Sequence, residues 1–578
     1  MDTTPTQKAG DLRTVAYFSL EVGLDPEMPT YSGGLGVLAG DTLRAAADLG
    51  SPMVGVTLLY RKGYFRQYLD SVGNQTDSPC EWSPEDFLEP LEPRASLTLH
   101  GRTVHVRAWQ YVVRGIGGHT VPVYFLDTAL SDNDPYDQSL TDQLYGGDAE
   151  YRFCQEALLG IGGMAMLEAL GHDSIRTCHM NEGHSALLAL ALLEEQMGGR
   201  PMESAADGDI EQVRERCVFT THTPIPAGHD KFSWDLVQRV LGEKWVVAIE
   251  KMGCLLDGEL NMTFLGMFFS HYINGVSMRH EQISQGMFPN YPLNSITNGV
   301  HAVTWTSASF SRLYDKHMPE WRKDNRYLRY GVSIPLNEIQ HAHAVAKHDL
   351  IRMVEERTTV QLDKTVITIG YARRATQYKR ANLLFTDPER LRRLAREAGP
   401  LQIIYGGKAH PKDESGKELI REIFQAAAEL RDDITVVYLE EYDMALAKLM
   451  CSGVDLWLNT PQKPHEASGT SGMKAALNGV PSLSILDGWW IEGHVEGVTG
   501  WSIGEGWEQE SHPERESVSL YDKLEYVILP MFYGRPTAYA QVMRSAITLN
   551  GSFFNVQRMM TQYMMNAYPT VDRIEVRG

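Results

Sequence analysis

The sequence predicts an α/β protein with two doubly wound domains that meet at a ligand cleft. The chain has 578 residues, which is too long for one hydrophobic core. Short apolar or β-branched runs alternate with longer helical patterns, as is typical of parallel sheets covered by helices on both faces. This alternation occurs twice over similar lengths. Such sheets bind ligands beyond the carboxyl ends of their strands, so we expect a shared cleft there.

The first half of the chain contains five predicted strands, a hairpin and several helices. The strands are expected at 14–22, 53–60, 121–128, 175–181 and 217–223. Helical periodicity marks the segments near 41–49, 149–170, 184–197 and 260–280. Residues 97–113 differ, because they predict a β-hairpin that turns at His100-Gly101.

The second half repeats the scheme after a long predicted helix at 336–357. Its strands are expected at 366–371, 401–407, 434–440, 454–459 and 481–486. We place an N-terminal domain at 1–298, a C-terminal domain at 299–549 and a last helical segment at 550–578. That last segment either closes the second domain or crosses back to the first.

Composition limits the partners. The net charge of −21 disfavours nucleic acid and anionic membranes, so a phosphate-bearing ligand needs a local cationic pocket. Six scattered cysteines form no CxxC pair, which fits a reducing compartment. Residues 1–13 contain no signal-peptide core, and the longest apolar run, 186–193, is too short to span a bilayer. We therefore expect a soluble, cytoplasmic protein.

A glycine-rich loop follows the first predicted strand. Gly33, Gly34 and Gly36 in YSGGLGVLAGD would let the backbone approach a ligand at the start of a helix, where an anion is favoured. The alternative is a tight strand–helix turn without a ligand.

A cluster of cations follows the strand VITIGY. Arg373, Arg374, Lys379 and Arg380 stand within eight residues of each other in an acidic chain. Guanidinium groups match phosphate oxygens bidentately, and lysine adds a compact charge. The cluster therefore favours phosphate binding over the alternative, a solvated helix face.

A second candidate anion site lies in EASGTSGMK, residues 466–474. Its small residues could form a nest of backbone amides at a helix start. Lys474, one turn into the helix, would be partly buried, which lowers the pKa of an amine toward nucleophilic use. The alternative is a capped helix whose lysine points to water.

Histidines and aromatic residues near strand ends are further candidates. A metal site formed by His179, His184 and Glu182 is not expected, because the spacing gives poor ligand geometry. Contacts to a polar substrate, or core packing, are favoured for these histidines and for His222 and His301. Four aromatic residues could stack on sugars, although core packing is their default role: Tyr17, Tyr31, Trp489 and Trp490.

Taken in order, nine segments resemble the α-glucan (glycogen, starch and maltodextrin) phosphorylases. They are AYFSLEVGL, YSGGLGVLAGD, NEGHSALL, FTTHTP, ITNGV, YKR, IIYGGKAHP, LEEYDMALA and EASGTSGMKAALNG. The resemblance implies two Rossmann-like domains of the GT-B type and pyridoxal 5′-phosphate bound covalently at Lys474. It also implies reversible phosphorolysis of α-1,4-glucans, with glucose 1-phosphate released with retention and the cofactor phosphate exchanging the proton.

The resemblance also implies site residues. Arg374 and Lys379, with the glycine loop at Gly33 and Gly34, match the positions that hold substrate phosphate. Arg373 matches a contact to the cofactor phosphate, together with Gly469, Thr470 and Ser471. The glucose contacts match Glu466, Ala467, Ser468, Gly469, Asn298 and His222, and the carbonyl of His222 would lie near the anomeric carbon.

This chain departs from the family pattern at several positions. It has GTSGMK where better-known members have GTGNMK, Thr376 and Gln377 where they have histidine and glutamate, and Val37 in place of an arginine. It is also shorter than the animal and plant enzymes, so we expect no regulation by AMP. A homo-oligomer is possible, but their dimer interface is not carried over.

Three alternatives stay open. A nucleotide-sugar synthase of the same fold is disfavoured, because Lys474 rather than a glutamate follows Glu466 by eight positions and Ser32 replaces a lysine. A non-catalytic glucan-binding relative is disfavoured because all the cationic positions are present. A phosphorylase with a different acceptor or linkage is the third.

Overall fold

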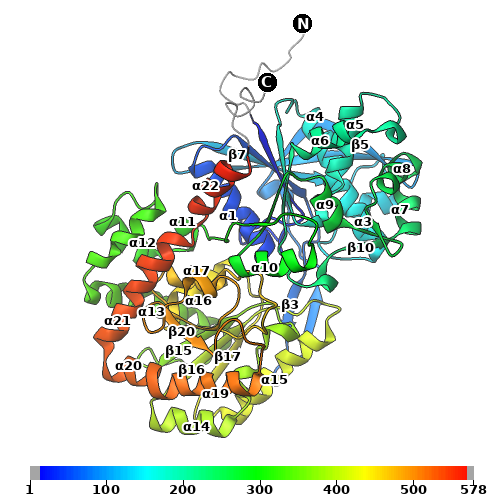
Figure 1. Cartoon of the computed structure of the whole chain (residues 1–578). Coiled ribbons are helices and arrows are strands. Elements are labelled where there is room, and N and C mark those ends of the chain that lie inside the picture. The colour runs from blue at the N-terminus through cyan, green and yellow to red at the C-terminus, as the bar shows by residue number, and fades with distance from the viewer. Residues whose placement is uncertain (1–12, 569–578) are drawn as a thin grey trace.

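The computed structural model describes residues 13–568, which form two lobes, each built on a mainly parallel sheet (Figure 1). The predicted α/β class is therefore confirmed. Residues 1–12, where a signal peptide was considered, lie outside the described range. Among the described residues, no helix combines the length and apolar character needed to cross a lipid bilayer.

The N-terminal lobe contains a nine-stranded sheet in the order β14-β13-β9-β8-β1-β2-β7-β6-β5. The strands from β14 to β7 run parallel, and β6 and β5 add an antiparallel edge. The bounds are β1 Val15–Ser19, β2 Met53–Leu58, β5 Glu89–Leu99, β6 Arg102–Arg114, β7 Thr120–Asp127, β8 Thr177–Asn181, β9 Cys217–Thr220, β13 Tyr272–Gly275 and β14 Asn294–Ser295. All five strands predicted for this half are present.

The predicted hairpin is also present, as β5 and β6. His100 and Gly101 connect these strands with φ angles of 53° and 71°. Two adjacent positive φ angles are what a two-residue hairpin turn requires, and Gly101 adopts such an angle without strain.

One predicted helix is wrong. The segment 260–280 contains helix α9 (Met262–Phe268), but strand β13 follows it and pairs with β9 in parallel. Short apolar runs fit a helix or a buried strand equally well by pattern alone. Pairing with the edge of the sheet decides the outcome here.

The C-terminal lobe contains a fully parallel sheet in the order β17-β16-β15-β18-β19-β20. The bounds are β15 Ile367–Ala372, β16 Leu401–Gly406, β17 Thr435–Leu439, β18 Leu456–Asn459, β19 Ser482–Ile485 and β20 Gly500–Ile503. Among the helices of this lobe are α13 Leu336–Thr358, α14 Pro388–Glu397, α15 Glu414–Leu430, α16 Met444–Gly453, α17 Ser471–Ala476 and α19 Pro513–Lys523. Strand β20 was not predicted.

The last described helix, α22 (Val556–Asn566), returns to the N-terminal lobe. It packs near α1 (Gly34–Asp48), and Met559 and Met560 belong to the same apolar cluster as Leu43 (Figure 1). The Tyr563 hydroxyl lies 3.0 Å from Nδ2 of Asn274 in that lobe. The domain limits at 298 and 549 stay a prediction.

Candidate functional site

Every site residue that the family resemblance implies lines one cavity of about 700 Å³ between the two lobes. From the N-terminal lobe these are Gly33, Gly34, His222 and Asn298, and from the C-terminal lobe Arg373, Arg374, Lys379, Glu466, Ala467, Ser468, Gly469, Thr470, Ser471 and Lys474. Most of them follow the carboxyl end of a parallel strand, which is where α/β sheets bind ligands. The sheets therefore bring together residues far apart in the sequence.

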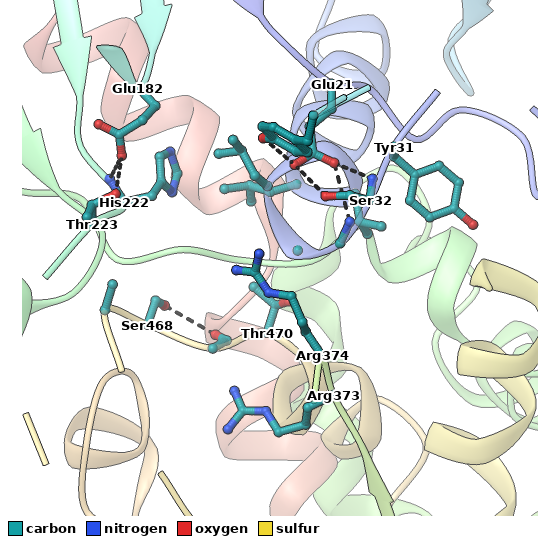
Figure 2. A pocket seen from close by; sticks show the side chains of 18 of the residues that line it. Glu21, Tyr31, Ser32, Glu182, His222, Thr223, Arg373, Arg374, Ser468 and Thr470 are labelled. Atoms are coloured by element: carbon teal, nitrogen blue, oxygen red, sulfur yellow. Dashed lines mark hydrogen bonds between the residues drawn. The ribbon is translucent and has the colours of Figure 1, made fainter. Parts of the chain in front are cut away.

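The glycine loop leads from β1 into helix α1, which begins at Gly34. The Glu21 carboxylate accepts hydrogen bonds from the backbone N–H of Ser32 at 2.5 Å and of Gly33 at 3.3 Å (Figure 2). A Cβ atom at Gly33 or Gly34 would meet no other atom within 4 Å. Packing therefore does not demand glycine there, and the loop leaves open space at the cavity wall.

Of the two arginines that follow β15, Arg373 forms an ion pair within the described part of the chain and Arg374 does not. Nη2 of Arg373 lies 2.5 Å from Oε2 of Glu466, and Nζ of Lys379 lies 2.6 Å from the same oxygen. Burial alone would raise the pKa of Glu466, but Arg373 and Lys379 outweigh burial and lower it to about 2. Nη1 of Arg373 is buried and has no hydrogen-bond partner among the described residues.

Arg374 is a cation of the cavity wall that stays available to bind an anionic ligand. Its guanidinium extends toward the glycine loop, whereas Arg373 turns away from it (Figure 2). The side chain is exposed to the cavity. Within residues 13–568 it has no hydrogen bond and no ion pair with a carboxylate. A guanidinium that has no ion pair and lines a cavity is suited to bind a phosphate group.

Lys474 occupies the middle of the short helix α17. The helix follows Gly469, whose φ of 76° is the left-handed conformation that favours glycine. Nζ of Lys474 lies 3.6 Å from the centroid of the Trp305 ring. Burial lowers the pKa of this amine. Lys474 is thus a buried amine at the cavity wall rather than a lysine that points to bulk water.

His222 and Asn298 present polar groups from the N-terminal lobe. His222 bonds through Nε2 to Oδ1 of Asn181 at 2.6 Å, and its backbone N–H donates to Glu182 at 2.6 Å (Figure 2). Burial lowers the pKa of His222 to about 3, so the ring is neutral at neutral pH. Oδ1 of Asn298 is buried without a partner among the described residues, so it can accept a hydrogen bond from a ligand.

Several lining residues escaped the sequence analysis. Lys408 and His410 follow β16, and they lie in the segment IIYGGKAHP that carried part of the resemblance. Arg152 and Asp230 also line the cavity, where they form an ion pair. Arg152 comes from helix α3 (Ala149–Ala157) and Asp230 from a loop, so no strand end could have revealed them.

Other candidates are structural. Trp489 and Trp490 are 3% and 1% exposed and belong to the C-terminal core. Arg380 is bound to Glu516 at 2.6 Å. His179 lies in the N-terminal core and bonds to Thr220. Within residues 13–568, no three His, Cys, Asp or Glu side chains gather as metal ligands.

Comparison with known proteins identifies the family of this chain. The sequence model of carbohydrate phosphorylase matches residues 246–498. The chain is 37% identical to maltodextrin phosphorylase of Thermococcus litoralis, over 96% of this chain and 70% of that protein. It is 34% identical to glycogen phosphorylase of Mycobacterium tuberculosis, with the same coverage, and 33% identical to that of Aquifex aeolicus, over 97% and 86%. The chain belongs to the carbohydrate phosphorylase family and is an enzyme of the glycosyltransferase class.

Proposed function

We propose that this protein is an α-1,4-glucan phosphorylase that cleaves glycogen- or maltodextrin-type chains reversibly with inorganic phosphate. The products are α-D-glucose 1-phosphate, released with retention, and a shortened glucan. One observation carries the proposal: a single cavity holds the unpaired guanidinium of Arg374 and the buried amine of Lys474. The names of the relatives support the same substrates.

Inorganic phosphate is the proposed ligand of Arg374. The guanidinium offers charge-assisted hydrogen bonds, and Gly34 on the glycine loop lines the same cavity. Lys379 adds a second cation, although its ammonium group already forms an ion pair with Glu466. Binding of a dianion here would place its oxygens beside the position of the scissile sugar.

The family's cofactor, pyridoxal 5′-phosphate, fits the residues present. The buried amine of Lys474, with its lowered pKa, would hold the aldehyde covalently, and the unpartnered Nη1 of Arg373 would bind the phosphate. Backbone amides of Gly469, Thr470 and Ser471 would complete that phosphate site. When bound, the cofactor supplies a phosphate group that donates a proton to, and accepts one from, the substrate phosphate.

The terminal glucose of the chain is the proposed ligand of the remaining polar groups. Oδ1 of Asn298, which has no partner among the described residues, would accept a hydrogen bond from a sugar hydroxyl. Residues 466–469 would bind hydroxyls on the far side of the ring. The backbone carbonyl of His222 would lie near the anomeric carbon, as the family resemblance implies, and its own N–H donates to Glu182. Positive charge that develops on the sugar would be stabilised by the nearby phosphate dianion.

The test uses purified protein with pyridoxal phosphate, maltoheptaose and inorganic phosphate. We expect release of glucose 1-phosphate that requires the added phosphate. No release from a protein that has bound the cofactor would favour a different acceptor or linkage. No release and no cofactor would favour a non-catalytic glucan-binding protein. Homo-oligomer formation stays a prediction that gel filtration would test.

A further inference from the structure

A small hairpin of the N-terminal half docks on the C-terminal lobe. It consists of β3 (Arg66–Leu69) and β4 (Gln75–Ser78), and it extends from the first lobe to the second (Figure 1). Gln67 and Gln75 are 1% and 7% exposed, whereas the side chains next to them in the hairpin, Tyr68 and Thr76, face solvent. Two buried glutamines on so short a hairpin require hydrogen-bond partners.

The side-chain amide of Gln75 forms two hydrogen bonds with the backbone of Ala409, as the backbone of a neighbouring strand would. Its Oε1 accepts a hydrogen bond from the N–H of Ala409 at 3.0 Å. Its Nε2 donates to the carbonyl oxygen of Ala409 at 2.8 Å. The side-chain amide thus satisfies both polar groups of Ala409 and fixes its orientation.

Gln67 extends this arrangement to two further segments. Its Nε2 donates to the carbonyl of Gly407 at 3.1 Å and to Oε1 of Gln75 at 2.9 Å. Its Oε1 accepts from the N–H of Glu441 at 3.0 Å, and its own N–H donates to the Glu441 carboxylate at 2.6 Å. The two glutamines therefore form a connected network in which each amide oxygen and nitrogen has a partner.

The glutamates of LEEYD, a segment without a role in the proposed reaction, complete the docking. Glu440 accepts a hydrogen bond from the N–H of Leu69 at 2.9 Å. Glu441 lies 2.7 Å from Nζ of Lys408, which also donates to the carbonyl of Phe65 at 2.9 Å. The hairpin and the preceding Phe65 thus contact each of the residues Gly407, Lys408 and Ala409.

Gly406, Gly407 and Lys408 in turn contact the backbone on both sides of Arg374. The N–H of Arg373 donates to the carbonyl of Gly406 at 3.1 Å, and the N–H of Ala375 donates to the carbonyl of Lys408 at 3.0 Å. Gly407 lies so close that a Cβ atom there would be 1.8 Å from the carbonyl oxygen of Arg373. No ion pair in the described structure holds the Arg374 guanidinium, so the hydrogen bonds on both sides of Arg374 are the contacts that fix the position of this residue.

We propose that Gln67 and Gln75 are positioning residues that aim Arg374 at the substrate phosphate through residues 407–409. The inference rests on the proposed function, in which Arg374 binds inorganic phosphate. A merely structural contact between the lobes would impair folding or all substrates alike. A positioning role affects phosphate selectively.

The experiment measures steady-state kinetics of the holoenzyme with Gln75→Met, which keeps the length of the side chain and removes its hydrogen bonds. We expect KM for phosphate to rise about tenfold, with kcat and KM for maltoheptaose changed less than about twofold. KM for glucose 1-phosphate in the synthetic direction should rise with that for phosphate. Thr76→Val, an exposed change on the same strand, should leave all constants as in the wild type.

A double-mutant cycle tests the route through Arg374. In an Arg374→Ala background, adding Gln75→Met should change KM for phosphate less than about twofold. Gln67→Met serves the same design if Gln75→Met does not fold. An unchanged KM for phosphate, an equal rise in KM for glucan, or full additivity in the cycle would overturn the inference. A wild-type enzyme that releases no glucose 1-phosphate would instead overturn the proposed function.

Discussion

Lys474 lies with its Nζ atom 3.6 Å from the centroid of the Trp305 ring, so the amine rests on an aromatic face at the wall of the cavity. Trp305 is fixed in turn, because its Nε1 donates to Oδ2 of Asp41 on helix α1 at 2.7 Å. Burial lowers the pKa of Lys474, and the Asp41 carboxylate partly opposes that effect. The amine is therefore held in one place and is easier to deprotonate than a surface lysine.

Lys474→Ala should abolish retention of pyridoxal phosphate, because the substitution removes the buried amine that would bind the aldehyde covalently. The measurement is the absorbance of the bound cofactor after gel filtration, together with phosphorolysis of maltoheptaose. Lys448→Ala is the matched control, since Lys448 also has a pKa lowered by burial but does not line the cavity. A Lys474→Ala protein with full cofactor content and activity would refute the assignment.

Arg374→Ala should lower kcat/KM for phosphate by at least roughly tenfold, because a charge-assisted contact to the substrate is lost. The melting temperature should change little, since the guanidinium has no hydrogen bond or ion pair within residues 13–568. Arg374→Lys should recover part of the affinity, and the exposed Arg329→Ala serves as control. Phosphate kinetics equal to those of the wild type would exclude the proposed role.

Two alanine substitutions in helix α1 should affect different properties: Gly40→Ala should lower stability, and Gly34→Ala should weaken phosphate binding. At Gly40 a Cβ atom would lie 1.9 Å from the carbonyl oxygen of Gly23, so Gly40→Ala should lower the free energy of unfolding by about 1–3 kcal/mol. At Gly34 a Cβ atom meets nothing, so Gly34→Ala should leave stability within about 1 kcal/mol and raise KM for phosphate instead.

Urea unfolding and initial rates of glucose 1-phosphate release separate these effects. If Gly34→Ala unfolds early, or if Gly40→Ala is as stable as the wild type, the packing described for this helix is incorrect.

The architecture could be predicted where strands are long and apolar. The strands β1, β2, β15 and β16 are buried on both faces, so the sequence shows them as mainly apolar runs. Short pieces escaped prediction. Strand β13 and the hairpin of β3 and β4 depend on partners distant in sequence, and local pattern does not encode those partners.

The candidate site was predicted more completely than the contacts within it. Residues such as Arg374 and Lys474 follow strand ends or glycine-rich turns, which are signals visible in one sequence. The ion pairs of Glu466 with Arg373 and Lys379 join residues about ninety positions apart, so only the fold reveals them. Arg152 and Asp230 were missed for the same reason.

Glu156 lies on helix α3 behind the cavity wall, and its environment predicts a pH-dependent stability. The side chain is 1% exposed, and neither carboxylate oxygen has a hydrogen-bond partner among the described residues. Burial raises the pKa of Glu156 from 4.5 to about 8, with a further contribution from Asp230, while His184 and Arg152 act in the opposite direction. The group is therefore neutral in the folded protein at neutral pH.

The free energy of unfolding of the wild type should fall as pH rises, and Glu156→Gln should abolish the part of this fall that is due to Glu156. In the unfolded chain Glu156 ionises near pH 4.5, whereas in the folded protein it stays neutral until about pH 8. Its raised pKa thus contributes stability fully below pH 4.5, and this is lost at roughly 1.4 kcal/mol per pH unit up to about pH 8. At pH 9 the variant should be more stable than the wild type by roughly 2–5 kcal/mol, and near pH 4 the two should be equal.

Urea unfolding across this pH range measures the difference, with the exposed Glu168→Gln as control. Curves that stay parallel from pH 5 to pH 9 would show that Glu156 is ionised in the folded protein.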